Sequence, residues 1–205
     1  MKKNFSSILF WGSVWGFLEA TLGYLLHLID FIPGLSSITM TSIGFYCIYR
    51  AFKNTDDINC AFLVSFIASG IKFVDFLLPL SSPFKVINPA IAILLEGSFA
   101  YLAIKSFSDN KLNVKEIISF NFLWRFAFVF IQIIEMQFSP MKPIIFRGSS
   151  KALGFLLYQP LVSSFVIVFL VFAINNSEKR FKKLSFKPSI SFSLFFMALF
   201  AQFML

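Results

Sequence analysis

The sequence has few of the residues that soluble enzymes and metal sites use. Among 205 residues there are one histidine and two cysteines, and only 14% of the residues are charged. A single histidine excludes a cluster of histidine metal ligands, and Cys47 and Cys60 lack the close spacing typical of zinc sites. The chain has no P-loop, Gly-x-Gly-x-x-Gly, His-Glu-x-x-His or Gly-x-Ser-x-Gly motif. We therefore expect no metal ion and no cofactor.

The composition is instead typical of a polytopic membrane protein. Hydrophobic residues make up 58% of the chain, and its mean hydropathy is +0.80. Soluble domains average about 25% charged residues, so no stretch remains for a soluble domain. The net charge of +8 does not indicate nucleic-acid binding, because the basic residues lie in short loops between apolar stretches.

Long apolar runs predict an all-α bundle of six to seven transmembrane helices, forming one domain over residues 1–205. About 20 residues suffice to cross a bilayer core, and turn-forming sequences such as Pro33-Gly34 separate the runs. The last run is short and ends at the C-terminus. The expected spans are 8–29, 35–52, 58–78, 88–106, 116–138, 152–174 and 189–205.

The loop charges predict a cytoplasmic N-terminus. With that orientation, twelve lysine and arginine residues lie on the inner side and four on the outer side, while Lys72 and Arg125 fall within spans. Such a bias follows the positive-inside rule. We expect a multi-pass protein of the cell membrane, with a bacterial plasma membrane as the simplest setting. The outer four are Lys85, Lys142, Arg147 and Lys151.

Polar side chains within the spans are the candidates for a binding site. An ionisable group at membrane depth costs roughly 2.5–3.5 kcal/mol on insertion scales, so such groups mark functional sites by default. The expected topology puts them between the midplane and the outer surface, which predicts a cavity open to the outside. The candidate substrate-binding residues are Glu19, His27, Lys72, Asp75, Asn88, Glu96, Arg125, Gln132, Glu135 and, from an outer loop, Arg147.

The same residues allow other interpretations. Lys72 and Asp75 are three residues apart and can pair on one helix face. Arg125 can neutralise Glu96 or Glu19, so that these groups only fix the register of the helices. A membrane enzyme that uses buried carboxylates as acid or base on a lipid-soluble substrate is another alternative. An assembly subunit without any ligand is a further one.

A stripe of small residues, Gly12, Gly16 and Ala20, lies on the first expected span. Residues spaced by four share one face of a helix, and small residues let another helix approach closely within lipid. The stripe therefore predicts a helix-packing face.

This stripe, the loop Phe31-Ile32-Pro33-Gly34 and the stretch 86–97 together resemble the substrate-binding (S) components of energy-coupling factor transporters. The resemblance implies a bundle, typically of six helices, that captures a vitamin-like small molecule from outside the cell. It implies a transmembrane coupling subunit docked on Gly12, Gly16 and Ala20, with cytosolic ATPases as further partners. The protein would then be a transport subunit and not an enzyme. A seventh span departs from the six-helix pattern.

The four basic residues of the outer loops predict an anionic ligand. Basic groups around a pocket raise the local concentration of an anion, an effect that salt weakens. Arg147 could bind a carboxylate with both arms of its guanidinium. Contact with lipid phosphates is an equally good interpretation of these residues.

Overall fold

The computed structural model describes residues 2–29, 32–79, 82–106, 113–138, 142–178 and 186–204. Within these ranges the chain is helical, with short connections and no strand, so the fold is an all-α bundle. A π-helical turn occurs at two places: η1 follows α1 directly, and η5 lies between α7 and α8. The elements are α1 (Lys2–Leu18), η1 (Glu19–Gly23), α2 (Tyr24–His27), α3 (Leu35–Thr55), α4 (Cys60–Lys72), η2 (Phe73–Leu77), α5 (Phe84–Lys105), α6 (Val114–Glu135), η4 (Ile144–Phe146), α7 (Ser149–Leu153), η5 (Gly154–Tyr158), α8 (Gln159–Glu178) and α9 (Pro188–Met204).

Each expected span coincides with a helix or a run of consecutive helical segments. Among the described helices, five are long and apolar enough to cross a membrane, as a membrane protein requires. Consecutive segments join to reach this length, for example α7, η5 and α8. The five are Asn4–Leu26, Cys60–Leu77, Phe84–Lys105, Val114–Glu135 and Ser149–Asn176.

The two remaining expected spans differ from these five for different reasons. Helix α3 has 21 residues but carries Arg50, Lys53 and several serines and threonines. It lies at the centre of the bundle and contacts α1, α4, α5 and α8, so its polar side chains can face protein instead of lipid. Helix α9 is apolar but has only 17 residues.

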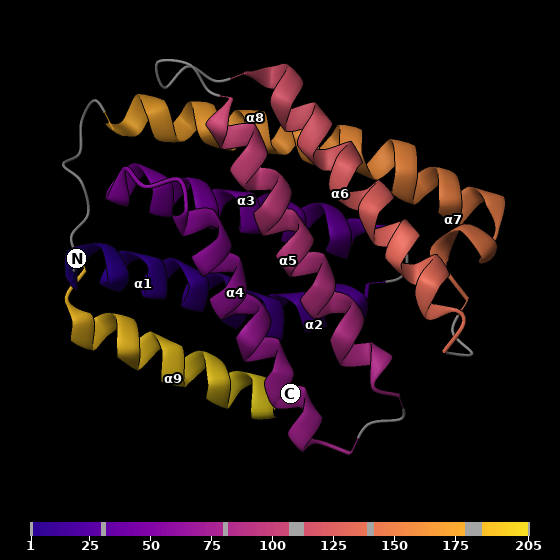
Figure 1. The fold of residues 1–205 in the computed structure, drawn as a ribbon, viewed down its shortest axis with the longest axis horizontal. Helices are drawn as coiled ribbons and strands as arrows, with labels where there is room; N and C mark the ends of the chain where they lie inside the picture. The colour runs from indigo at the N-terminus through magenta and orange to yellow at the C-terminus, as the bar shows by residue number, and fades with distance from the viewer. Residues whose placement is uncertain are drawn as a thin grey trace.

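The helices form two layers. Figure 1 shows α9, α1, α3 and α8 running roughly along the horizontal axis, while α4, α5 and α6 cross them steeply. In the first layer α1 contacts α9 and α3, and α3 contacts α8. In the second layer α5 lies between α4 and α6. Contacts of α1 and α3 with α4, and of α6 with α8, join the layers.

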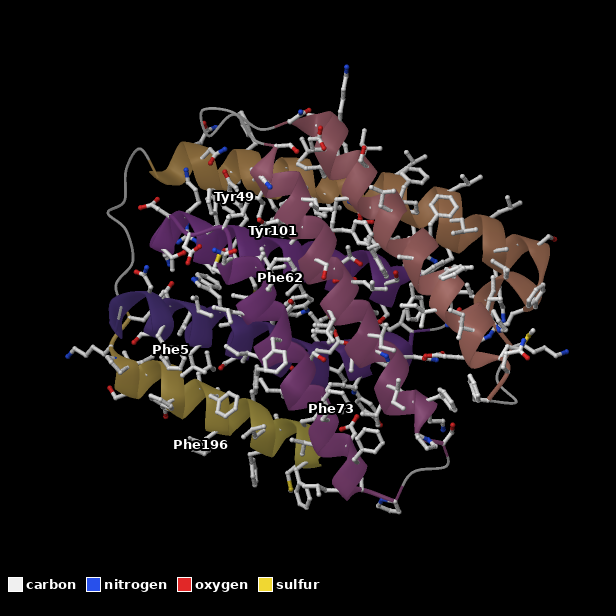
Figure 2. All side chains as sticks on the ribbon, in the orientation of Figure 1. Phe5, Tyr49, Phe62, Phe73, Tyr101 and Phe196 are labelled. Atoms are coloured by element: carbon white, nitrogen blue, oxygen red, sulfur yellow. The ribbon has the colours of Figure 1, made fainter. Side chains whose placement is uncertain are left out.

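The outer surface of the bundle is rich in exposed aromatic rings. Phe165 is 76% exposed, Phe66 69% and Phe196 64%, and Figure 2 shows Phe196 projecting from α9. Between α4 and α5, Phe62 and Tyr101 bring their ring centroids within 4.7 Å. Large hydrophobic side chains are exposed on α4, α5, α6, α8 and α9, so the structure suits a lipid environment.

The small-residue stripe packs inside the bundle: Ala20, in η1, is 2% exposed, and α4 covers Gly12 and Gly16 of α1. A Cβ atom at Gly12 would lie 2.8 Å from Cβ of Ile67 and 3.1 Å from the carbonyl oxygen of Val64. One at Gly16 would lie 2.5 Å from Cδ1 of Ile71. The face expected to receive a coupling subunit is thus already covered by α4 of the same chain, and a partner would have to reach α1 elsewhere.

Chemical labelling in whole cells tests the expected orientation. Cysteines placed at Lys142 and Ser149, both exposed and in the expected outer connection, should react with a membrane-impermeant maleimide. Cysteines at Lys115 and Lys187, also exposed, should react only after the cells are permeabilised. The two native cysteines are fully buried and should contribute little background. The opposite labelling pattern would contradict a cytoplasmic N-terminus.

Candidate functional site

The candidate residues fall into separate groups in the structure. One group surrounds Arg125 at the junction of α3, α6 and α8, with Glu96 of α5 nearby. A second joins Lys72 and Asp75 to α9. A third lies where the first turns of α5 meet the end of α6.

Arg125 is the largest fully buried polar side chain among the described residues, with no exposed surface. Its Nη1 donates to the backbone oxygen of Asn121 at 3.0 Å and to Oδ1 of Asn121 at 3.2 Å. Its Nη2 donates to Oγ of Ser163 at 3.3 Å and to Oγ of Ser37 at 3.4 Å. Three helices therefore supply neutral oxygen atoms to this guanidinium. We call Arg125, Asn121, Ser37 and Ser163 the arginine cluster.

Two aromatic rings complete the surroundings of Arg125. The carbon Cζ of the guanidinium lies 4.4 Å from the ring centroid of Trp124 and 5.6 Å from that of Phe155. Both rings are almost fully buried, and a ring face attracts a cation that has lost its water. The Nε atom of Arg125 has no hydrogen-bond partner among the described residues.

The described residues include no carboxylate within ion-pair distance of Arg125. This corrects the expectation that Arg125 pairs with Glu96 or Glu19. Glu96, only 7% exposed, accepts a hydrogen bond from Oγ1 of Thr41 at 2.8 Å. It lies within electrostatic range of both Arg125 and Glu19. Glu96 therefore offsets part of the buried positive charge from a distance, without occupying the guanidinium.

The expected ion pair between Lys72 and Asp75 is confirmed. Lys72 Nζ lies 2.9 Å from Asp75 Oδ2, and the two side chains are 16% and 15% exposed. Gln202 of α9 donates from Nε2 to the other oxygen of Asp75. Glu19 lies beside Gly23 and within electrostatic range of Lys72. This group ties α4, η1, η2 and α9 together.

A third group lies where α5 begins and α6 ends. With its amide nitrogen facing the carboxylate, Asn88 donates to both oxygens of Glu135 at 2.6 and 2.9 Å. Gln132 Oε1 accepts from the backbone N–H of Ile144 at 3.1 Å, which fastens the segment before α7 to α6.

The remaining candidates are dispersed. Arg147 is exposed, donates from Nε to the carbonyl oxygen of Lys142 at 2.7 Å, and does not belong to the arginine cluster. Ala20 is buried within η1. The side chain of His27 lies outside the described part of the structure.

Sequence reasoning did not single out Ser37, Thr41, Asn121, Gln159 and Ser163 as site residues. Each has a polar partner four residues away, giving Ser37 with Thr41, Asn121 with Arg125, and Gln159 with Ser163. Residues four apart lie on the same helix face. Three such pairs on three apolar spans were a usable signal for one shared buried cluster.

Comparison of the chain with family models, curated proteins and solved structures gives no match. The function is therefore inferred from geometry. Within the described residues, no group of three or more histidine, cysteine, aspartate or glutamate side chains could hold a metal ion. What the arginine cluster offers chemically is a dehydrated cation with one free donor, an arrangement suited to holding an anion.

Proposed function

We propose that this chain is a membrane-embedded binding subunit that captures a small anionic molecule at the arginine cluster. The role is that of the substrate-binding component of an uptake transporter of the energy-coupling factor type. The observation that carries the proposal is the fully buried Arg125, whose described hydrogen-bond partners are all neutral.

A guanidinium inside an apolar bundle is costly when no carboxylate lies within ion-pair distance, even where a carboxylate such as Glu96 offsets part of its charge from farther away. Taking a charge out of water costs several kcal/mol per ion in real proteins, which neutral hydrogen bonds only partly recover. A ligand carboxylate would restore the missing charge and could accept from Nε, the free donor. The start of α3 adds to this preference, because Ser37 lies in its first turn, and a helix N-terminus attracts anions.

A second observation supports an anionic ligand. Lys85, Lys142, Arg147 and Lys151 are all exposed, and the expected topology puts them on the outer side. Exposed charges of one sign raise the local concentration of an oppositely charged molecule, and salt screens this effect. These residues would attract the anion, whereas Arg125 would hold it.

The proposal is tested by identifying what the purified protein retains. Wild-type protein purified in mild detergent should release a stoichiometric anionic compound on denaturation, detected by negative-ion mass spectrometry. Arg125→Gln should retain at least tenfold less, because glutamine keeps hydrogen-bonding capacity but removes the charge. Arg125→Lys should fall between them, since an ammonium lacks the planar fork of donors.

Arg147→Gln is the matched control. It also removes one guanidinium, but from an exposed position, so it should retain the compound in detergent. Circular dichroism and size-exclusion chromatography must show that each variant is folded. Equal retention by wild type and Arg125→Gln would contradict the proposal and make Arg125 a structural residue. A wild-type protein that carries no anion would also contradict it.

A further inference from the structure

A buried hydrogen-bond acceptor without a partner among the described residues belongs to Gln159, which is bonded to Ser163 of the arginine cluster. Gln159, the first residue of α8, is only 7% exposed, and its Oε1 has no partner among the described residues. Buried polar atoms are almost always paired in folded proteins. Like the Nε atom of Arg125, this oxygen is therefore a candidate for a hydrogen bond to a ligand.

Gln159 is connected to Arg125 through one hydroxyl group. Ser163 donates from Oγ to the backbone oxygen of Gln159, and the same Oγ accepts from Arg125 Nη2 at 3.3 Å. Through its backbone, Gln159 of α8 therefore belongs to the same buried network as Arg125 of α6, and each of these two residues has one side-chain atom without a hydrogen-bond partner among the described residues.

Contact with the start of α3 holds the Gln159 side chain in place. A Cβ atom at Gly34 would lie 2.2 Å from Gln159 Nε2 and 2.5 Å from its Cδ. Gly34 has a φ of +80°, a backbone conformation that residues other than glycine rarely adopt. Only glycine lets the amide lie so close to the backbone here, so the packing holds the amide group of Gln159 against the start of α3.

We infer that the anion recognised at this site carries a hydrogen-bond donor next to its carboxylate, as a 2-hydroxy acid does. This inference rests on the proposed function. The carboxylate would accept from Arg125, and the neighbouring hydroxyl would donate to Gln159 Oε1. A plain carboxylate would satisfy only the first of these groups and leave a buried oxygen unpaired. A site built to hydrogen-bond a substrate group discriminates strongly against analogues that lack it.

Two matched pairs of acids test the inference: lactate with propionate, and mandelate with phenylacetate. The members of each pair differ by one hydroxyl group. Binding to purified protein is measured by the rise in melting temperature over a concentration series. In at least one pair the hydroxy acid should bind wild type at least tenfold more tightly than its partner. Gln159→Met, which keeps the side-chain length but removes the acceptor, should abolish that preference. Arg125→Gln should weaken both acids.

The outcomes separate this inference from the proposed function. Equal affinity within each pair, with binding still dependent on Arg125, would overturn the inference and leave the proposed function standing. A hydroxyl preference that survives in Gln159→Met would also overturn the inference. So would binding of none of the four acids, in which case the retained-anion measurement judges the proposed function independently. The melting temperature of Gln159→Met without acid shows whether the variant is folded.

Discussion

Gly12→Leu should strongly destabilise the protein, whereas Gly70→Leu should be tolerated. A side chain at Gly12 meets Cβ and Cγ2 of Ile67 at 2.8 and 2.9 Å and the carbonyl oxygen of Val64 at 3.1 Å. None of these atoms is the far end of a flexible side chain, so α1 and α4 would have to separate. Overpacking costs about 1–3 kcal/mol or more, and we expect the melting temperature to fall by about 10 °C.

Gly70 provides the matched control on the partner helix. It lies on α4, and a Cβ atom there meets nothing within 4 Å. Thermal unfolding in detergent, followed by circular dichroism, compares the two variants directly. A Gly12→Leu protein as stable as wild type would mean that this face of α1 is free, as docking of a coupling subunit requires. Equal damage by both substitutions would mean that leucine is poorly tolerated at helical glycines in general.

The second large effect is expected at Asp75. In Asp75→Asn the shape of the side chain and its acceptor for Gln202 remain, but the charge that balances Lys72 is lost. Removing one partner of a fully buried ion pair costs roughly 3–5 kcal/mol, because the other charge stays buried; since Lys72 and Asp75 are 16% and 15% exposed, we expect a cost at the lower end of this range. The melting temperature should fall by about 10 °C, and Lys72→Met combined with Asp75→Asn should recover most of this loss.

A double-mutant cycle measured by thermal unfolding provides the coupling energy between the two residues. Lys115→Met is a suitable control, because it removes an exposed lysine near the start of α6 and should leave stability unchanged. If Asp75→Asn proves as stable as wild type, Lys72 is adequately balanced by Glu19 or by water. A double variant no more stable than Asp75→Asn would show that the lost charge is not the cause.

Local sequence patterns were enough to predict the helices. The apolar runs and the turn residues between them set the helix ends to within a few residues, as with the span expected at 35–52 and observed as Leu35–Thr55. Backbone groups in lipid must be paired within their own segment, so an apolar run of this length has little choice but to be helical. The ion pair between Lys72 and Asp75 was also predictable from local sequence, because residues three apart on one helical segment lie on the same face.

Side-chain neighbours from different helices were not predictable in this way. The sequence suggested Glu96 or Glu19 as the partner of Arg125, whereas the structure provides Asn121, Ser37 and Ser163. The sequence suggested the two glutamates only because their charge is opposite to that of Arg125. Which groups meet depends on how each helix is rotated about its own axis and where it crosses the next one, and small rotations exchange one set of neighbours for another.

The sequence by itself determined that this chain is an apolar helical bundle with ionisable groups inside its apolar helices. Only the tertiary structure decided that α4 covers Gly12 and Gly16, that α9 reaches Asp75 through Gln202, and that Arg125 lies among neutral groups. The physical reason is how far apart in the sequence the interacting residues lie. Helix formation depends on residues within one or two turns of each other, while packing depends on shape complementarity between segments that lie far apart in the chain, such as Ser6 and Ser191, which are 185 positions apart and hydrogen-bonded.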